Sequence, residues 1–597
     1  MHTNIIVRGF ITCALSLCLS GWIFVSSASA ATIVVNTNLD VVDPPFNTGG
    51  LCGSGTIADL PGNDGKISLR EAINAANNTP GVKSIIFALS PGDATIVLTG
   101  PLYLCGGQTT LNGDVNGDKT PDVTIDGAAG TFPFEVINIV SSHNTVKNLQ
   151  VLAPPGGGSG ISVSATPAVA TTIVDNTIAH NIVSGIVEIL AGADLFNNRQ
   201  SINDVTIKHV RVRDNEVSGS PIFGILAGNN GDRNVLTDLT ITGNTVFGNR
   251  EGISVRNGWQ NPFDPTDDGA SDNRLDVLIT DNTVTGNTVP AEAFRDGISI
   301  YGGFNFFSPT SVSSNNYLTA QVRGKRVENN VGPGIVTFGG YGGATDNRLD
   351  VTVKDNIVTG NQNPGDTGGI IVLGGFAASS NQVRTNLLSN SITNNNGIGI
   401  SVGSGLDNSS TNDVVVTIRD NALENNAGAG IVTYGAIGAL FFPGGDSSGN
   451  TLDTRIERNT VKNAALFGIL VVGGVGSLDG APIKVANNNA VTAVVTDNTV
   501  TGTVGEGMVL NAGGSGAANT NDVEVTAKKN TVCGSAATDI HAIGGSFGIP
   551  ALLPPNQGTG NTVEGTITKN TATTVVVENG VAGNSATVTQ LNNDTCP

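Results

Sequence analysis

A calcium-binding loop is the most specific chemistry that the sequence suggests. Asp114, Asn116, Asp118 and Asp122 provide side-chain oxygens at spaced positions of the segment DVNGDKTPD. Oxygen ligands in this pattern, closed by a final carboxylate, are what a hard cation such as Ca²⁺ prefers. The sequence therefore predicts calcium as a cofactor held by these four side chains. Lys119 stands where such a loop usually turns sharply at a glycine, and the alternative is an Asx-rich turn without metal.

Two carboxylates, Glu251 and Asp296, are the fallback candidates for catalysis. Each follows an arginine and directly precedes a Gly-Ile pair, so equivalent positions on neighbouring repeats would place them side by side. Carboxylates about 5 Å apart can hydrolyse a glycoside, and carboxylates with arginine suit a calcium-assisted β-elimination of a uronate. Stacked Arg-Glu and Arg-Asp pairs also form ordinary surface charge networks. We therefore lean towards a protein that is not an enzyme.

The histidines after residue 30 do not suggest a site. His143, His180, His209 and His541 show no spacing typical of metal ligands. No Ser-His-Asp or Cys-His arrangement follows from the spacing either. Catalytic residues are therefore not assigned beyond the fallback pair.

Aromatic residues form the best candidate for a binding surface. Strand alternation directs Arg256, and the equivalent residues Tyr301, Phe338 and Tyr434, away from the interior, and Trp259 follows in a loop. Further rings lie in such loops: Phe263, Phe304, Phe306, Phe307, Tyr341, Phe376, Phe441 and Phe442. Exposed rings in a row would stack on the sugars of an extended glycan. The alternative is that the loops pack together and bury the rings as a second core.

A repeat that covers most of the chain positions these candidates. An asparagine recurs at intervals of 29 to 43 residues if Lys325 fills one vacant slot. Its positions are Asn176, Asn215, Asn244, Asn282, Asn356, Asn390, Asn421, Asn459, Asn498, Asn530 and Asn570. A second asparagine often follows five residues later: Asn181, Asn249, Asn287, Asn330, Asn361, Asn395 and Asn426. A Gly-Ile pair then opens an apolar run, and a repeat of this length indicates a solenoid or a propeller.

Each unit contains three short segments that read as strands. One is an alternating run such as residues 349–353, the next is centred on a valine, and the third begins with Gly-Ile. Asn and Gly tolerate the left-handed backbone that sharp corners need. The prediction is an all-β fold, a single-stranded parallel β-helix of about 12 or more coils, with asparagines stacked along its axis. A β-propeller is the alternative, but its blades need four antiparallel strands and a regular aromatic signature.

A helix over residues 66–77 precedes the repeats. Ser68 and Glu71 make a capping box, and Leu69, Ile73 and Ala76 share an apolar face. An open β-helix end would expose strand edges and an apolar bore. We therefore expect this helix to cover the N-terminal end as a cap.

The segment SLREAINAAN at residues 68–77, followed by Pro80-Gly81 and IIF at 85–87, resembles the N-terminal segment of bacterial CSLREA-domain proteins. The resemblance covers residues 31–90, and the repeats show a weaker similarity over most of the remainder. It implies a secreted protein with right-handed, pectate-lyase-like parallel β-helix repeats, and the preferred hand of parallel crossovers agrees. Ile67 stands where the family has its cysteine. The family implies a fold and an extracellular address but no defined activity.

Residues 1–30 have the pattern of a secretory signal peptide. Arg8 precedes an apolar stretch over residues 10–25, and Ala28-Ser29-Ala30 provides a cleavage site. Nothing later in the sequence approaches membrane-spanning length. The formal net charge is −20, and it becomes −21 once Arg8 is removed, so nucleic acid is excluded as a partner.

Four cysteines remain after residue 30: Cys52, Cys105, Cys533 and Cys596. Two precede the repeats and two lie at their end, and an oxidising compartment favours disulfides. Three pairings are open. Proximity in the sequence favours Cys52–Cys105 with Cys533–Cys596, and unpaired buried thiols are the alternative.

Four segments follow from these observations. They are a signal peptide at 1–30, a CSLREA-like cap segment at 31–122, β-helix repeats at 123–532, and last coils with a C-terminal cap at 533–597. The leading interpretation is a secreted or cell-surface protein that binds an extracellular polysaccharide or matrix through its lateral aromatic loops. The alternatives are a polysaccharide lyase or glycoside hydrolase acting in a groove on the β-helix, and a structural stalk.

Overall fold

A computed structural model describes the chain from residue 30 to its end, with gaps. The described residues are 30–47, 50–90, 94–129, 135–194, 200–259, 269–288, 295–305, 313–439, 446–477, 485–514, 517–545 and 558–597. The predicted signal peptide therefore lies outside the described residues, except for Ala30.

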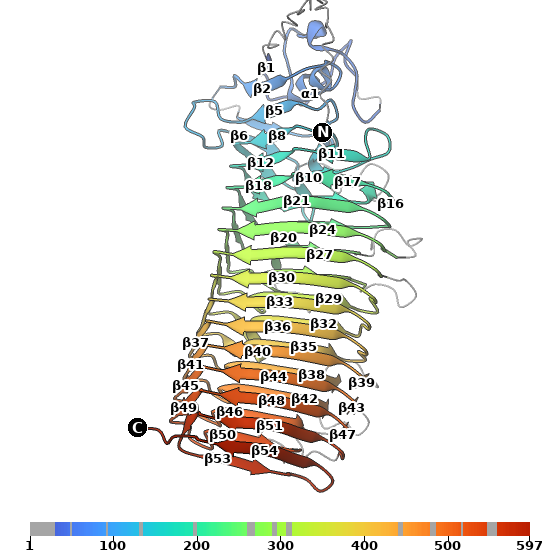
Figure 1. Cartoon of the computed structure of the whole chain (residues 1–597). Helices are drawn as coiled ribbons and strands as arrows, with labels where there is room; N and C mark the ends of the chain where they lie inside the picture. The colour runs from blue at the N-terminus through green and yellow to red at the C-terminus, as the bar shows by residue number, and fades with distance from the viewer. Residues whose placement is uncertain are drawn as a thin grey trace, which may run out of the picture.

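The chain is a parallel β-helix, as predicted (Figure 1). It winds through three long parallel sheets, which we name A, B and C in the order in which each coil visits them. In the described chain, sheet A has 19 strands, and sheets B and C have 15 each. The coil is right-handed, because the sheet A arrows run leftwards on the near face of Figure 1 and the chain returns behind them as it descends.

Sheet A has four more strands than the other two sheets because β1 and β54 flank the complete coils and two coils each contribute a pair of short strands. Its strands are β1 (Ala31–Val35), β2 (Lys83–Phe87), β5 (Thr109–Asn112), β8 (Thr145–Lys147), β11 (Thr172–Val174), β12 (Thr177–Ala179), β17 (Thr206–Lys208), β18 (Arg211–Arg213), β21 (Val235–Thr242), β24 (Arg274–Thr280), β27 (Tyr317–Arg323), β30 (Arg348–Lys354), β33 (Gln382–Leu388), β36 (Asp413–Arg419), β40 (Thr451–Glu457), β44 (Ala490–Thr496), β48 (Asp522–Lys528), β51 (Thr562–Thr568) and β54 (Ser585–Leu591).

Sheets B and C follow in turn along each coil. Sheet B contains β3 (Thr95–Val97), β6 (Val123–Asp126), β9 (Leu149–Leu152), β13 (Ile182–Ser184), β19 (Glu216–Ser218), β22 (Thr245–Phe247), β25 (Thr283–Thr285), β28 (Arg326–Glu328), β31 (Ile357–Thr359), β34 (Ser391–Thr393), β37 (Ala422–Glu424), β41 (Thr460–Lys462), β45 (Thr499–Thr501), β49 (Thr531–Cys533) and β52 (Thr571–Ala572). Sheet C contains β4 (Leu102–Leu104), β7 (Glu135–Ile139), β10 (Ser159–Ser164), β14 (Ile186–Ala191), β20 (Phe223–Asn229), β23 (Glu251–Arg256), β26 (Ile298–Tyr301), β29 (Ile335–Tyr341), β32 (Gln362–Phe376), β35 (Asn396–Leu406), β38 (Ile431–Ala439), β42 (Ile469–Ser477), β46 (Met508–Gly513), β50 (Ile540–Ile543) and β53 (Val575–Glu578). Two small sheets lie between sheets C and A and consist of β15 (Ala193–Asp194) with β16 (Gln200–Ser201), and of β39 (Ser447–Ser448), β43 (Val485–Asn487) and β47 (Ala517–Asn519).

Alternation within each strand builds the interior. In β30, Leu349, Val351 and Val353 are buried, whereas Asp350 and Thr352 point outward. The same register holds on the neighbouring coils, so buried valines, leucines and isoleucines stack into one continuous core. Burial of this apolar column is the main stabilising term of the fold.

Buried asparagines line the corner between sheets A and B, as predicted. In each step the backbone N–H and Nδ2 of one asparagine donate to Oδ1 of the next, as Asn390 does to Asn421 at 2.9 Å for both bonds. The ladder contains Asn181, Asn215, Asn244, Asn282, Asn356, Asn390, Asn421, Asn459, Asn498, Asn530, Asn570 and Asn593, and Lys325 occupies the slot between Asn282 and Asn356.

The predicted assignment of Asn176 to this ladder is wrong. Asn181 precedes Asn215, whereas Asn176 accepts from the backbone N–H of Asn144. The reason is that the sheet A segment of this coil is split into β11 and β12, which creates an additional corner at Asn176. The second predicted ladder, between sheets B and C, runs without interruption through Asn249, Asn287, Asn330, Asn361, Asn395 and Asn426. Asn181, which was predicted to begin this series, belongs to the ladder between sheets A and B.

A third ladder, at the corner between sheets C and A, was not predicted. It contains Asn234, Asn273, Asn316, Asn347, Asn381, Asn412, Asn450, Asn489, Asn521, Asn561 and Asn584. The signal was present, because each of these asparagines directly precedes a sheet A strand. All three corners of the coil are therefore held by buried amide hydrogen bonds.

The left-handed residue of each corner is the one before the ladder asparagine. Asp281 before Asn282 has φ of 54°, Asp355 before Asn356 has φ of 55°, and Gly286 occupies the same place before Asn287. Asp and Gly enter this conformation more easily than branched residues. The ladder asparagine itself contributes its side-chain amide.

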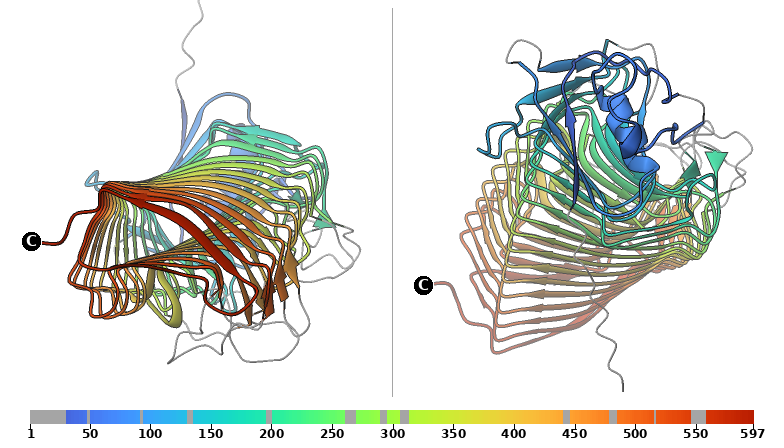
Figure 2. Two further views of the ribbon diagram at one scale, coloured as in Figure 1. Left: turned by 60° about the horizontal axis from the view of Figure 1, so that its bottom comes forward. Right: turned by 90° about the horizontal axis from the view of Figure 1, so that it is seen from above.

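The helix α1 (Leu69–Asn77) covers the N-terminal end of the coil (Figure 2, right). The predicted capping box is confirmed, because the Ser68 hydroxyl accepts from the Glu71 N–H at 3.2 Å and Glu71 accepts from the Ser68 N–H at 2.9 Å. Leu69, Ile73 and Ala76 are buried. A short 3₁₀ helix, η1 (Ile57–Asp59), precedes α1.

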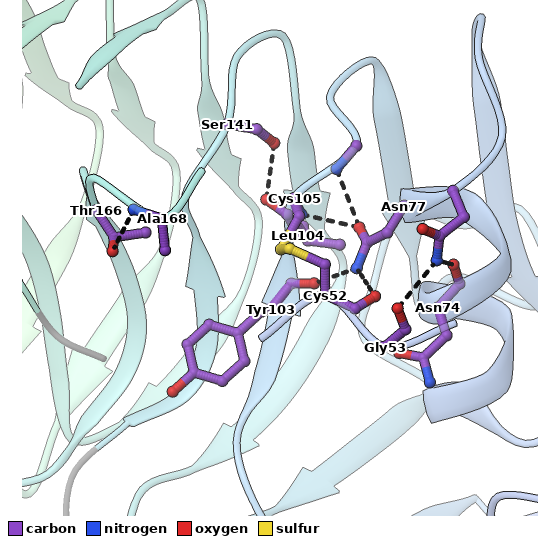
Figure 3. The surroundings of a disulfide bond; sticks show 12 residues. Cys52, Gly53, Asn74, Asn77, Tyr103, Leu104, Cys105, Ser141, Thr166 and Ala168 are labelled. Atoms are coloured by element: carbon purple, nitrogen blue, oxygen red, sulfur yellow. Dashed lines mark hydrogen bonds between the residues drawn. A yellow bond between two sulfur atoms is a disulfide. The ribbon is translucent and has the colours of Figure 1, made fainter. Parts of the chain in front are cut away.

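Two disulfides tie the ends, in the predicted pairing. Cys52–Cys105 joins the segment before α1 to the segment after β4, next to Asn77, whose Oδ1 accepts from the Cys105 N–H at 2.8 Å (Figure 3). Cys533–Cys596 joins β49 to the C-terminal tail. Among the described residues, no helix is both long and apolar enough to cross a membrane.

Candidate functional site

The outer face of sheet C carries a second hydrophobic cluster, which we name the lateral core. Its buried members are Ile186, Leu190, Ala193, Phe223, Leu226, Trp259, Tyr301, Phe304, Tyr341, Leu373, Phe376, Leu406, Ala429, Val432, Tyr434, Val472 and Val475. It lies on the side of sheet C away from the main core, so the chain has two apolar layers with one sheet between them.

The predicted aromatic strip lies within this lateral core. Arg256, Tyr301 and Phe338 are aligned on successive coils, and Tyr434 continues the column beyond Leu373 and Gly403. The expected exposure is wrong: Arg256 is 3% exposed, Trp259 5%, Tyr301 1% and Tyr434 6%. Phe338 is partly buried and packs against the same cluster. The structure thus corresponds to the alternative, in which the rings form a second core.

Stacking of the loops that follow sheet C explains this burial. Trp259, Phe304 and Tyr341 form parallel bridges from coil to coil, so the loops extend the sheet for one more position. Their rings then stack along the axis of the β-helix. The ring centroid of Tyr341 lies 4.8 Å from that of Phe376 and 5.2 Å from that of Phe304, with interplanar angles of 4° and 14°. Rings spaced by one coil cover one another. Phe263, Phe306, Phe307, Phe441 and Phe442 lie outside the described residues.

Arg256 is the charged centre of the lateral core. Its guanidinium carbon lies 4.2 Å from the ring centroid of Phe304, 4.6 Å from that of Phe223 and 5.4 Å from that of Trp259. Its Nη2 pairs with Glu251 Oε2 at 3.1 Å. A desolvated arginine held by rings and a carboxylate stabilises the cluster and has little surface left for a ligand.

The two fallback catalytic carboxylates do lie on adjacent coils, as predicted. The Gly252 N–H donates to the Asp296 carbonyl at 3.0 Å, which places Glu251 and Asp296 in register. Glu251 is fully buried: its Oε1 accepts from the Ser299 hydroxyl and its Oε2 pairs with Arg256. Asp296 is 7% exposed. A polymer could reach Glu251 only after displacing the lateral core.

Burial also governs the titration of the aromatic hydroxyls. Desolvation raises the pKa of Tyr301 and of Tyr341 well above the ordinary value, and the nearby carboxylate of Asp296 adds to the effect. Both phenols are therefore neutral over the physiological range. Within the described part of the lateral core, Arg256 pairs with Glu251, and the carboxylate of Asp296 lies near the same rings.

The loop at Asp114–Asp122 brings the predicted calcium ligands together. Carboxylate oxygens of Asp114, Asp118 and Asp122 lie within 4.8 Å of one another. The Asn116 Nδ2 donates to Asp122 Oδ1 at 3.2 Å. A cation there would meet a hard oxygen donor set. Calcium binding remains a prediction.

Backbone amides hold the same carboxylates. Asp114 accepts from the N–H of Gly117 at 2.6 Å and of Lys119 at 3.0 Å, and Asp122 accepts from the Val115 N–H at 2.7 Å. The hydroxyl and N–H of Thr120 lower the pKa of Asp118. Lys119 has φ of 70°, so it adopts the left-handed conformation for which a glycine was expected. The loop is closed by its own hydrogen bonds, as in the Asx-rich alternative.

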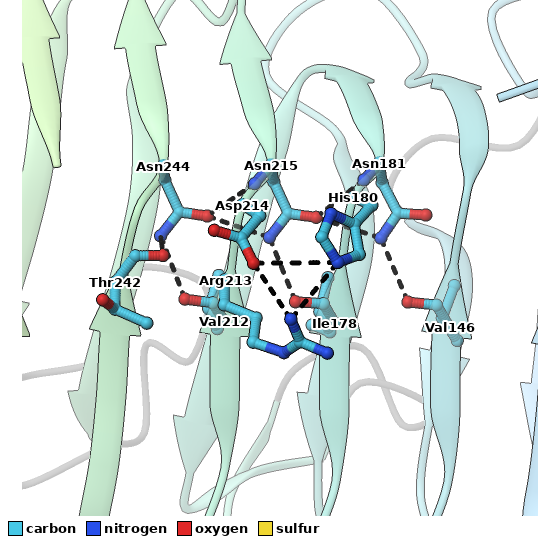
Figure 4. Close-up of polar contacts among 10 residues, drawn as sticks. All are labelled: Val146, Ile178, His180, Asn181, Val212, Arg213, Asp214, Asn215, Thr242 and Asn244. Atoms are coloured by element: carbon cyan, nitrogen blue, oxygen red, sulfur yellow. Dashed lines mark hydrogen bonds and ion pairs between the residues drawn. The ribbon is translucent and has the colours of Figure 1, made fainter. Parts of the chain in front are cut away.

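Histidines gather in a way that sequence spacing did not indicate. His143, His180 and His209 each occupy a left-handed corner, with φ of 63°, 56° and 54°, and each faces an aspartate of a neighbouring coil. His143 and His209 share one corner, two coils apart with Asp175 between them, whereas His180 lies with Asp214 at another corner (Figure 4), so the sequence intervals gave no usable signal before the register was known. His541 lies at the other end of the chain, between Glu506 at 2.7 Å and Glu578 at 2.9 Å.

A cavity of about 580 Å³ lies beside α1. Arg70, Asn74, Thr99 and Tyr103 contribute to its lining. The Arg70 guanidinium pairs with Asp40 at 2.8 Å and donates to the carbonyl of Pro101 at 2.8 Å. Arg70 therefore holds the cap together and does not face the cavity as a free cation.

Comparisons with known proteins add little. No protein-family model matches the chain, and no curated protein does. Among solved structures, the chain is similar to the A-module of mannuronan C-5 epimerase AlgE6 from Azotobacter vinelandii. The match covers 87% of this chain and 91% of that chain at 12% identity, with a TM-score of 0.22. A similarity at this level supports no functional argument, and the resemblance of residues 31–90 to the CSLREA segment stays a prediction.

Proposed function

We propose that this protein is a secreted structural protein, an elongated stalk that keeps its shape without metabolic chemistry. The observation that carries the proposal is the burial of the lateral core. Side chains that would have to face a glycan or a polymer cleft, Arg256, Trp259, Tyr301 and Glu251, contact one another instead. Their role is to thicken the wall of the solenoid.

The continuous coil supports the same proposal. The apolar column and the asparagine ladders at the A–B and C–A corners extend along most of the described chain, and the ladder at the B–C corner supports the central coils from Asn249 to Asn426. Each coil contacts its neighbours through parallel sheets. Such an assembly resists bending, because a bend would break ladder bonds on one side and open the apolar column. Secretion is supported by the two disulfides, which persist in oxidising compartments.

Binding of a polysaccharide or matrix glycan through the lateral aromatics is the function that this proposal replaces. The two are separated by a glycan-array measurement combined with the Trp259→Ala and Arg256→Met variants. The stalk predicts no saturable glycan binding by the wild-type chain and a lower melting temperature for both variants. Specific binding that Trp259→Ala abolishes without a change in melting temperature would contradict it.

Catalysis is tested in the same samples. Polysaccharides incubated with the protein should release no new reducing ends and no unsaturated uronates, with or without calcium. Activity that Glu251→Gln removes while the melting temperature stays unchanged would favour the enzyme instead.

A further inference from the structure

The two ends of the β-helix differ within the described part of the chain. At the N-terminal end, α1 lies across the coil. At the C-terminal end, the last strands of sheets C and A, β53 and β54, form the edge of the coil, which we name the C-terminal rim (Figure 2, left). β54 pairs with β51 on one side, and no described strand pairs with its other side. The last strand of sheet A is therefore open to a partner.

The main apolar core is uncovered by described residues at the same rim. Ala586 and Val588 of β54, and Val575 and Val577 of β53, are only partly buried. They continue stacks whose preceding members, such as Val563, are fully buried. Another layer of apolar side chains with the same cross-section would complete their burial and stabilise the last coil.

Backbone groups of β54 alternate between the β51 side and the open side. The Ser585 N–H donates to the preceding coil at 3.0 Å, so the odd-numbered residues of β54 face β51. The even-numbered residues Ala586, Val588 and Gln590 direct their N–H and C=O groups to the open side. The Ala586 N–H is occupied, because it donates to the Asn579 side chain at 2.9 Å. Val588 and Gln590 are the residues whose backbone can pair with a further strand.

β54 lacks the features that usually protect an edge strand. Natural edges are blunted by charged side chains, proline or bulges. The sequence of β54, SATVTQL, contains neither a charge nor a proline, and its register with β51 is continuous. The chain has a formal net charge of −20, so most of its surface repels a second copy. A neutral strand at the rim is a place where two copies can approach each other.

We propose that a second copy of the chain pairs with β54, so that two β-helices join end to end at their C-terminal rims. A two-fold axis through Val588 makes the two β54 strands antiparallel and sets Val588 opposite its own copy. Ala586 then faces the partner's Gln590. Thr587 faces the partner's Thr589, a cross-strand threonine pair of the kind that stabilises antiparallel sheets. The apolar core of one copy continues into that of the other.

An identical end meets both requirements of the rim, a strand for β54 and an apolar layer for the core. A single peptide strand would supply the first without the second. The N-terminal end of another copy does not fit, because α1 covers its core. The contact is therefore isologous and closes as a dimer instead of growing into a filament. This inference does not depend on the stalk function.

Sedimentation velocity of the full chain, combined with small-angle X-ray scattering, tests the contact. With rising concentration the wild type should associate reversibly to twice the monomer mass, and its maximum dimension should nearly double. Thr587→Lys with Thr589→Lys should raise the dissociation constant of the dimer by about 100-fold or more, because lysines of both copies then face each other. Both threonines are exposed in the single chain, so the fold tolerates the change.

The matched control is Thr492→Lys with Thr526→Lys. These threonines are also exposed on the outer face of sheet A, but they lie on β44 and β48, away from the rim. The control should leave the dissociation constant unchanged. Melting curves verify that both variants are folded.

Hydrogen exchange of the wild type tests the contact without a variant. The Val588 and Gln590 amides should exchange more slowly at concentrations where the dimer forms. Unchanged exchange of both amides under these conditions contradicts the proposal. So do a wild type that stays monomeric at high micromolar concentration, assemblies larger than a dimer, and a dimer that survives the lysine pair at the rim.

Discussion

Replacing Lys325 by asparagine should stabilise the protein strongly. Lys325 occupies the slot of an asparagine between Asn282 and Asn356 in the ladder between sheets A and B, and it is 1% exposed. Its backbone N–H donates to Asn356 as in the other steps, but its Nζ has no hydrogen-bond partner among the described residues. The lysine also brings no amide oxygen to accept from Asn282. Lys325→Asn restores both missing groups.

The magnitude follows from the titration of the buried amine. Desolvation lowers the pKa of Lys325 from 10.5 to about 6, with Asp281 opposing the effect. At pH 7 the amine is therefore neutral in the folded protein and protonated in the unfolded chain. Each tenfold difference in proton affinity corresponds to 1.36 kcal/mol, so Lys325 destabilises the folded state by about 5 kcal/mol at pH 7.

The pH dependence has a defined sign. Between about pH 6 and pH 10.5 the unfolded state binds one more proton at this side chain than the folded state, so the free energy of unfolding rises with pH across this window. Lys325→Asn removes that contribution. The difference in stability between variant and wild type should therefore be large at pH 7 and shrink towards pH 10.

Denaturant unfolding at several pH values, followed by far-ultraviolet circular dichroism, measures the effect. Lys325→Met is the matched control, because it cannot titrate but also cannot join the ladder; it should recover the titration part of the gain alone. Hydrogen exchange of the coils around β27 and β28 locates the change. Equal stability of the wild type, Lys325→Asn and Lys325→Met at pH 7 would refute the reasoning. A difference in stability between wild type and variants that does not change with pH would refute it as well.

Four further outcomes follow. Arg256→Met should lower the free energy of unfolding by about 3–5 kcal/mol, because it leaves Glu251 buried and unpaired; adding Glu251→Gln should recover part of the loss in the same denaturation experiment. Asn381→Ala should remove about 2–4 kcal/mol in urea denaturation, because its side-chain amide accepts from Asn347 and donates to Asn412 and its loss leaves buried groups unpaired, whereas Thr352→Ala on the outer face should change little. Calcium should raise the melting temperature, and Asp118→Asn should abolish that rise; a rise that persists in Asp118→Asn would count against the metal site. Lys119→Gly should stabilise the loop, because glycine adopts the left-handed conformation of this position without the strain that a lysine has there. Burial alone would lower the pKa of His541, but Glu506 and Glu578 raise it overall, so the stability that this pair adds to the last coils should be complete below about pH 6.5 and decline as pH rises above it; His541→Gln should show no such decline in melting temperature.

Local patterns made the fold predictable. The alternation in segments such as β30 indicates strands, the Ser68–Glu71 capping box indicates the start of α1, and the recurring asparagines mark corners. Each of these signals concerns neighbouring residues. The pairing of the four cysteines followed from their grouping at the two ends of the repeat.

The asparagines assigned to the wrong corner show what such local patterns cannot predict. Asn176 and Asn181 are five residues apart like the other pairs, yet they lie at two corners of a split sheet A segment. The ladder through Asn381 was overlooked because loops of variable length precede it. Which asparagine follows which in space depends on the insertions within each coil, and a single sequence does not report these.

The solvent exposure of the side chains on sheet C was harder to predict than the face of the sheet to which they point. Alternation correctly directs Arg256 and Tyr301 to the outer face of sheet C, but it does not indicate whether the next loop folds back over that face. The stacking of Phe304 on Tyr341 decides this, and it involves residues more than 30 positions apart. His143 and Asp175 meet for the same reason, through coil register rather than sequence spacing.

Fluorescence of Trp259 tests the central claim most directly. Trp22 lies in the predicted signal peptide, so in the chain without residues 1–30, or with Trp22→Phe, all tryptophan emission comes from Trp259. A ring that is 5% exposed within the lateral core predicts emission well to the blue of the unfolded chain, weak quenching by acrylamide, and no response to added polysaccharide. Emission near that of the unfolded chain, strong quenching, and protection from the quencher by a polysaccharide would contradict a structural lateral core and establish it as a binding surface.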